Sequence, residues 1–208
     1  MHTAIYESPI GLITIESDEE ALTGLWIEGQ RHTSKNAANT QSQPTICPGW
    51  TFSNRPAKGT EENEGTESAS EIIKQTCKWL DIYFTGKEPS FMPPVRLSGT
   101  PFQLAVWRIL QRIPYGTTIT YGDIATKIAN GTANQGGKTK MSARAVGRAV
   151  GSNPISIIVP CHRVIGVNDR LTGYQGGIAL KVCLLGLEGL ETSTYQRGTS
   201  KVIHSLWT

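Results

Sequence analysis

The stretch that decides the interpretation of this chain is Ile157-Ile-Val-Pro-Cys-His-Arg-Val-Ile-Gly166. The apolar run 155–159, which follows the turn-forming pair Asn153-Pro154, predicts a buried extended segment that delivers Cys161 and His162 to the end of a rigid element. Cysteine is nucleophilic as a thiolate, and a neighbouring imidazole and cationic groups lower its pKa. The stretch therefore predicts an activated thiol, although a buried cysteine beside a hydrogen-bonded histidine fits the dipeptide as well.

Three helices are expected upstream of this stretch. Thr100-Pro101-Phe102-Gln103 combines a capping residue, a proline at the first helical position and a glutamine at the third, which predicts a helix through Ile113. A second helix is expected at about residues 121–129, followed by a flexible basic stretch at 131–140. Ser142 then caps a short helix that Gly151 closes.

The short helix carries two arginines on one face. Arg144 and Arg148 are four residues apart and project together, and another face is expected to hold the small or apolar residues Ala143, Val146, Gly147 and Val150. Two helices joined by a turn, the second armed with arginines, are typical of a helix-turn-helix DNA reader. A buried helix pair without contact to DNA is the alternative.

The N-terminal half has a different pattern. Residues 3–29 alternate as two or three antiparallel strands do, whereas the polar, aperiodic residues 31–67 predict a long surface loop. Ser68-x-x-Glu71 predicts a capping box for a helix that ends at Gly86 and buries Cys77. Residues 88–94 resemble a linker.

Charge changes sign at this linker. The net charge of +3 divides into −5 for residues 1–97, with eight basic against thirteen acidic residues, and +8 for residues 98–208, with twelve against four. The second half is therefore the candidate surface for a polyanion, and a solvated basic face is the alternative.

No secretory signal and no membrane-spanning stretch is evident, so we expect a cytoplasmic protein without membrane contact. The four cysteines show no close pairing, which predicts free thiols. His2, His32, Cys47 and Cys77 lack a recognisable ligand spacing, so no metal is expected.

Residues 157–166 resemble the active-site motif of the O6-alkylguanine-DNA alkyltransferases. The resemblance is close over residues 98–189 and holds only in outline over residues 1–90. Further motifs of that family follow in its order: Pro114-Tyr-Gly116, Thr120-Tyr121-Gly122, Ala143-Arg-Ala-Val-Gly147, Asn153-Pro154, Gly173-Tyr174-x-Gly-Gly177 and Leu184-x-x-x-Glu188-Gly189.

The resemblance implies an α+β fold in two domains. The first, residues 1–92, holds a small antiparallel sheet with a helix, and the second, residues 98–190, is helical with a winged-helix-like helix-turn-helix. Residues 191–208 form a tail of unknown role. The stretch 130–140 is longer and richer in glycine and lysine than in the shortest family members, which predicts a different geometry for that turn.

The resemblance also implies the chemistry. Cys161 accepts an alkyl group from O6-alkylguanine, and from O4-alkylthymine, in double-stranded DNA. His162 acts as its base through a water, Glu188 orients the imidazole, and Tyr121 donates a proton to the leaving guanine. Transfer is irreversible, needs no cofactor and consumes the protein, which is expected to be a monomer.

Binding roles are implied for a larger set. Arg144 enters the base stack while its helix lies in the minor groove and the damaged base rotates into a pocket. The pocket residues are Asn153, Val164, Tyr174, Gln175 and Gly176. The residues that contact DNA are Thr120, Ala143, Arg144, Gly147 and Arg148.

Two other classes of function stay open at this point. A binding module could hold damaged bases without accepting the group, or regulate through the helix-turn-helix, although Cys161 argues against the first because such binders replace the acceptor. A cysteine hydrolase could use Cys161 and His162, but nothing in the chain suggests an oxyanion hole.

Overall fold

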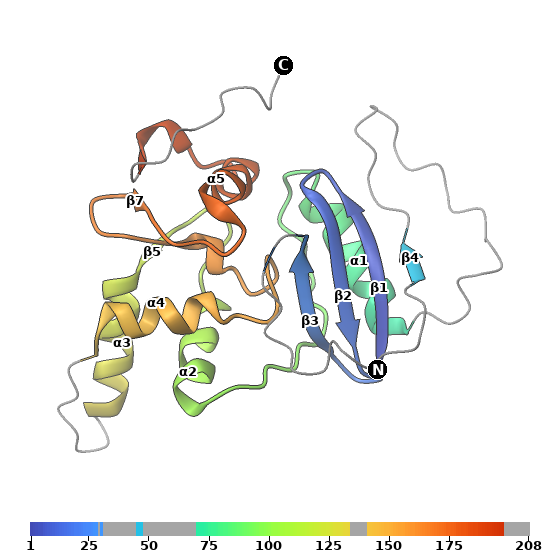
Figure 1. Ribbon diagram of the computed structural model, residues 1–208, viewed down its shortest axis with the longest axis horizontal. Helices are drawn as coiled ribbons and strands as arrows, with labels where there is room; N and C mark the ends of the chain where they lie inside the picture. The colour runs from blue at the N-terminus through green and yellow to red at the C-terminus, as the bar shows by residue number, and fades with distance from the viewer. Residues whose placement is uncertain (29, 31–44, 48–69, 134–140, 198–208) are drawn as a thin grey trace.

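The computed structural model describes residues 1–28, 30, 45–47, 70–133 and 141–197. The N-terminal sheet, backed by one helix, lies beside a group of helices formed by the C-terminal half (Figure 1). Strands β1 (His2–Ser8), β2 (Gly11–Ser17) and β3 (Leu22–Ile27) are antiparallel, as predicted. The α+β fold class expected from the sequence is confirmed.

A fourth strand corrects the loop prediction. Strand β4 (Thr45–Cys47) pairs in parallel with β1 and gives the sheet order β3-β2-β1-β4. These three residues fall inside the stretch predicted as loop, and the remainder of 31–67 lies outside the described residues. A three-residue strand on a sheet edge is held by backbone pairing, which has no periodicity to detect in the sequence.

Helix α1 (Glu71–Tyr83) covers the sheet through a broad apolar face. Its N-cap is Ser70, whose side chain accepts a hydrogen bond from Ile73 N, whereas the predicted cap, Ser68, lies outside the described residues. Cys77 is half-buried against the core and not fully inside it as predicted. The buried residues of the helix are Ile72, Ile73, Thr76, Trp79, Leu80 and Tyr83.

The C-terminal helices largely follow the prediction. Helix α2 (Pro101–Leu110) starts with the full capping box of Thr100 and Gln103, and it ends three residues before the predicted end at Ile113. Helix α3 (Tyr121–Ala133) runs four residues further than predicted, and α4 (Ala143–Gly151) is capped by Ser142. The predicted turn between them, residues 134–140, lies outside the described residues.

Shorter elements complete this half. Strands β5 (Ile119–Thr120) and β6 (Val164–Ile165) pair in parallel, as do β7 (Arg170–Leu171) and β8 (Gln196–Arg197). The 3-10 helix η1 (Cys161–Arg163) precedes β6, and α5 (Gly177–Leu187) is followed by the 3-10 helix η2 (Thr192–Thr194). The described part of the tail thus packs back onto the domain.

The run 155–159 is buried, as predicted, but it is not an extended strand. Only Ile155 forms a bridge, and Ile157 has a φ of 66°, in the left-handed region. The cause is Asn153, whose amide donates to the carbonyls of Ile155 and Val159 and whose carbonyl accepts from Ile155 N. A side chain that bonds three backbone groups holds a compact turn in place of a strand.

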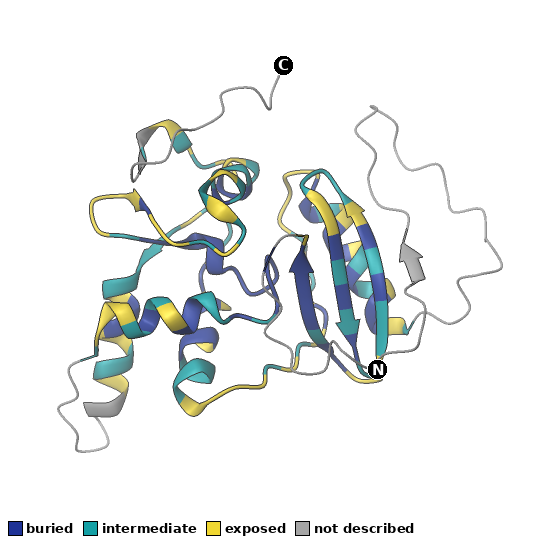
Figure 2. Cartoon of the chain, viewed as in Figure 1, coloured by how far each residue is buried: buried dark blue, intermediate teal, exposed yellow. Residues whose placement is uncertain are grey.

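Strand β3 joins the two halves. Leu25 N donates to Pro154 O at 3.0 Å and Leu25 O accepts from Ser156 N at 2.8 Å, while Leu22 pairs with the chain on both sides of Val95. One buried apolar cluster spans both halves, and β3 is buried almost along its whole length (Figure 2). Among the described residues, no helix is both long and apolar enough to cross a membrane.

Because the core is continuous across β3, we expect Leu25→Ala to destabilise both halves together. Leu25 is fully buried, so the cavity left by its side chain should lower the free energy of unfolding by about 2–5 kcal/mol in a single transition. Leu12→Ala is the control, since Leu12 is exposed on β2. Denaturant unfolding followed by tryptophan fluorescence measures both; two separate transitions would contradict a shared core.

Candidate active site

Cys161 opens η1, directly after the turn that Asn153 holds. Its side chain is buried and lines a small pocket of about 10 Å³, which has room for roughly one water molecule. Residues from both halves form this pocket. They are Gln30, Val150, Gly151, Asn153, Ser156, Cys161, Gly173, Tyr174 and Gln175.

The electrostatic setting of the thiol differs from the prediction. Burial raises the pKa of Cys161, and this outweighs the lowering by Asn153, by the charge of Lys181 and by backbone N–H groups. The expectation that its neighbours lower the thiol pKa overall is therefore wrong, because the site withdraws the sulfur from water more than it adds positive charge. Cys161 rests as a neutral thiol and needs a base to react.

His162 is the candidate for such a base. Its Nε2 lies 2.7 Å from Glu188 Oε1, and both side chains are inaccessible to solvent. Burial lowers the pKa of His162. Burial would raise the pKa of Glu188, but hydrogen bonds and charges from His162 and Arg163 outweigh it and bring that pKa down to about 2. An ionised carboxylate only accepts, so Nε2 carries the proton of a neutral imidazole. Nδ1 then keeps its lone pair, and it is buried without a hydrogen-bond partner among the described residues.

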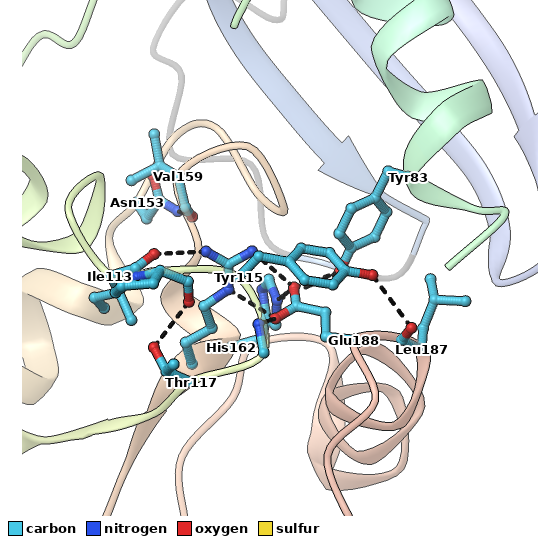
Figure 3. A network of polar contacts seen from close by, with 12 residues as sticks. Tyr83, Ile113, Tyr115, Thr117, Asn153, Val159, His162, Leu187 and Glu188 are labelled. Carbon is cyan, nitrogen blue, oxygen red and sulfur yellow. Dashed lines mark hydrogen bonds and ion pairs between the residues drawn. The ribbon is translucent and has the colours of Figure 1, made fainter. Parts of the chain in front are cut away.

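Glu188 accepts hydrogen bonds from several segments (Figure 3). Arg163 donates through Nε to Oε2 at 2.8 Å and through Nη2 to Oε1 at 3.0 Å, and Gly116 N donates to Oε2 at 3.2 Å. Arg163 also donates to Ile113 O and stands 5.5 Å from the centre of the Tyr115 ring. The bidentate contact fixes the plane of the carboxylate and keeps it charged.

The other predicted catalytic and pocket residues gather around this centre. The Tyr121 hydroxyl donates to Gly173 O at 3.1 Å, and burial raises its pKa to about 12, so it keeps its proton at neutral pH. The Tyr174 hydroxyl is buried beside the Cys161 thiol, and burial raises its pKa well above the usual value. Gln175 is exposed and donates to Gly151 O.

The two remaining residues predicted for the pocket, Val164 and Gly176, lie near it but are not among the residues that line it. Val164 is fully buried in β6, and its carbonyl accepts a hydrogen bond from Lys181. Gly176 is the N-cap of α5, where an added Cβ would come within 3.1 Å of Gln30 Nε2 and within 2.5 Å of Leu180. A larger residue at Gly176 therefore cannot be accommodated without movement.

Four of the residues predicted to contact DNA lie on α4, and the fifth, Thr120, directly precedes α3. Arg144 and Arg148 are exposed on α4. Gly147 faces the Tyr121 ring, and a Cβ added at Gly147 would lie 3.8 Å from the ring atoms Cδ1 and Cε1. Ala143, expected on the face of Val146 and Val150, is exposed, because it starts the helix beyond the core. Thr120 exchanges hydrogen bonds with Asp123 at the start of α3.

Sequence reasoning missed four residues of the site. Tyr83, from α1, donates to Glu188 Oε1 at 2.9 Å, and Gln30 accepts from Ser156 at the pocket wall. Lys181 is fully buried with a pKa of about 8, lowered by burial, and Arg163 holds Glu188. Two of the four offer a signal in the sequence: Arg163 follows His162 in the motif, and Lys181 is a lone charge in the apolar run of α5.

The described part of the chain contains no group of three or more His, Cys, Asp or Glu side chains that could hold a metal ion. The absence of a metal stays a prediction, because His32 and the Cys47 side chain lie outside that part.

Two family models together match nearly the whole chain. Residues 1–97 match the ribonuclease-like domain of 6-O-methylguanine DNA methyltransferase, and residues 101–190 match its DNA-binding domain. This chain belongs to the 6-O-methylguanine DNA methyltransferase family, as its motifs indicated.

Individual relatives agree with this assignment. The methylated-DNA–protein-cysteine methyltransferase of Methanosarcina acetivorans is 40% identical over 189 residues, which cover 91% of this chain and 99% of the relative. The protein of the same name from Mycolicibacterium paratuberculosis is 39% identical and covers 88% of each chain. The structure of Mycobacterium tuberculosis OGT in complex with DNA has a TM-score of 0.68 at 34% identity, covering 94% of this chain and 95% of that one.

The Glu188 carboxylate should link stability to pH. Its folded pKa of about 2 lies below the ordinary value of 4.5, so its contribution is complete above about pH 4.5 and is lost as the pH falls towards 2. We expect Glu188→Gln, which leaves Arg163 buried without its anion, to lose about 3–5 kcal/mol at neutral pH. This deficit should shrink steadily below pH 4.5.

Denaturant titrations between pH 7 and pH 2.5 measure this effect, with Glu7→Gln at an exposed position of β1 as the control. A deficit that stays constant over this range would contradict the assignment.

Proposed function

We propose that this chain repairs DNA by transferring the methyl group of O6-methylguanine, or a related alkyl group, to the sulfur of Cys161. The observation that carries the proposal is the contact of His162 Nε2 with Glu188 Oε1 at 2.7 Å, which leaves Nδ1 as a buried free base next to the thiol in sequence. Membership of the methyltransferase family supports the reaction. O4-alkylthymine is a second substrate of the same chemistry.

The reaction moves one proton and one alkyl group. The Cys161 proton passes through a water to His162 Nδ1, and the resulting imidazolium is stabilised by Glu188. The thiolate attacks the alkyl carbon, the sulfur–carbon bond forms and the carbon–oxygen bond to O6 breaks. Guanine leaves with a proton from Tyr121, which regains one from His162 through solvent. In sum, the thiol proton ends on guanine and the alkyl group on sulfur.

The properties of Tyr121 suit a proton donor. Its pKa of about 12 means that it holds a proton at neutral pH, and Cys161 is close enough to contribute to that pKa. Asn153, Tyr174 and Gln175 line the pocket that would hold the base, and Val164 and Gly176 would contact the base once the pocket has widened. The pocket must widen before a guanine enters, because its present space admits roughly one water molecule.

DNA is the partner, and α4 is the element that meets it. The DNA-binding family model, the solved complex of the tuberculosis relative with DNA and the exposed Arg144 and Arg148 support this. We assign Arg144 to the gap left by the rotated base in the minor groove, and Thr120, Ala143, Gly147 and Arg148 to contacts along the backbone.

We also propose separate roles for the two halves of the chain. The chemistry and the DNA contacts belong to a unit at residues 98–190, which a unit at residues 1–92 supports. The protein acts as a monomer in the cytoplasm without a cofactor.

Cys161 should be consumed once per protein. Transfer produces a thioether, which water does not hydrolyse, whereas the thioester of a cysteine hydrolase is released and permits turnover. We expect a plateau near one methyl per protein when excess methylated oligonucleotide is titrated, with about 14 Da added to the Cys161 peptide in mass spectrometry, as for covalent capture by a nucleophile. Cys161→Ala should bind DNA without transfer, and Cys77→Ala should transfer normally. Sustained turnover with unmodified Cys161 would refute the proposal.

Substitutions of Arg144 and Arg148 should have different effects on repair and on DNA binding. Rotating a base out of the duplex costs a few kcal/mol, so Arg144→Ala should slow repair of duplex DNA by about 10- to 100-fold. Reaction with free O6-benzylguanine, which needs no rotation, should be nearly unchanged. Arg148→Ala should instead reduce the slope of log affinity against log salt by about 1. Equal losses of Arg144→Ala on both substrates would exclude the role in base extrusion.

A further inference from the structure

Tyr83 connects the N-terminal half to the proton-transfer residues. It is the last residue of α1, and its side chain is fully buried. Its hydroxyl donates to Glu188 Oε1 at 2.9 Å and lies 3.4 Å from His162 Nε2 (Figure 3). Nothing in the motif around Cys161 points to this residue, which lies 105 positions before Glu188.

The hydroxyl is held in place by the aromatic rings around it. The Tyr83 ring stacks on Trp79 at 5.2 Å and meets Phe84 and Tyr115 edge-on, at 5.5 and 6.2 Å between ring centres. A ring packed on three sides has one orientation available, and only its hydroxyl is left to make a polar contact. That contact goes to the carboxylate oxygen that also accepts from His162.

We propose that Tyr83 is a positioning residue for alkyl transfer: its hydroxyl holds Glu188 Oε1 against His162 Nε2, so that Nδ1 remains the nitrogen that takes the Cys161 proton. The inference rests on the proposed function of Cys161. A donor to Glu188 shares the negative charge that the imidazole feels, and so weakens the hold of His162 on a proton.

The other groups that face His162 set the direction of the expected effect. Glu188 raises the pKa of His162, whereas burial, Arg163 and Lys181 lower it. Cys161 precedes it in η1, and Tyr83 is the group contributed by α1. Loss of the Tyr83 hydroxyl leaves more of the Glu188 charge to the imidazole, so the pKa of His162 rises and the neutral base is present only at higher pH.

The test compares two tyrosines of the same half. Tyr83→Phe removes the hydroxyl at Glu188, and Tyr6→Phe removes one that donates to Asp81 at 2.8 Å, between β1 and α1 and away from His162. The single-turnover rate of Cys161 alkylation by free O6-benzylguanine is measured from pH 5 to 9. For Tyr83→Phe we expect the acidic limb to move up by about 0.5 pH units or more, which is about a three-fold loss of rate on that limb.

Tyr6→Phe should lose stability without moving that limb. An NMR titration of the His162 imidazole, assigned with His162→Ala, should show the same upward shift in Tyr83→Phe alone. Should Tyr83→Phe not fold, 3-fluorotyrosine placed at position 83 alone keeps the shape with a stronger donor, and the limb should then move down.

The outcomes separate the two proposals. If Cys161 of the unsubstituted protein stays unlabelled with excess O6-methylguanine oligonucleotide, the proposed function itself is refuted, and the same oligonucleotide replaces O6-benzylguanine in the pH series if the benzyl group is not transferred. Normal labelling with the same pH profile in Tyr83→Phe and Tyr6→Phe, or an unmoved limb with the fluorinated residue, refutes the role of Tyr83 alone.

Discussion

A carboxylate can be buried only where donors replace the water it gives up, and Glu188 meets this condition with groups from separate parts of the chain. Arg163 and His162 come from η1, Gly116 from the connection after α2, and Tyr83 from α1. The anion therefore fixes the relative positions of these segments. Its charge, in turn, decides which nitrogen of His162 carries the proton, so the contacts that satisfy folding are also those on which the proposed proton transfer depends.

The turn that carries the nucleophile depends on β3 in a similar way. Asn153 closes the turn from inside, and Leu25 pairs with it from outside through Pro154 and Ser156. Gln30, just beyond β3, accepts from the Ser156 hydroxyl at 2.8 Å. The N-terminal sheet is thus a structural support of the pocket, and the shared core explains why its residues are apolar almost without interruption along β3.

Sequence reasoning located the centre of the site and missed its supports. The motif predicted Cys161, His162 and Glu188, and the structure brings the latter two into contact. Capping signals at Thr100 and Ser142 placed two helices correctly, because caps are local. Tyr83 could not be foreseen, since its partner is remote in sequence and an aromatic residue on a helix face predicts only packing.

The prediction of an extended strand at residues 155–159 was wrong for a related reason. Apolar runs report burial but not conformation, and here the Asn153 side chain supplies the hydrogen bonds that a neighbouring strand would otherwise supply. The prediction of a lowered thiol pKa failed because adjacency in sequence shows which charges are near but not how much water is excluded.

Two features together keep the Cys161 thiol unreactive until a nucleobase enters the pocket. The buried Cys161 rests as a neutral thiol, and the space beside it admits roughly one water molecule. Gln175, which donates to Gly151 O across the pocket, is exposed and therefore able to move at low cost. A nucleobase that enters must displace part of this wall, and under the proposed mechanism the thiol then loses its proton to His162, the next residue in η1. In the proposed reaction the damaged nucleobase both fills the pocket and supplies the alkyl group. A reactive thiolate is therefore not maintained in its absence, and a protein that can react only once keeps its sulfur for that nucleobase.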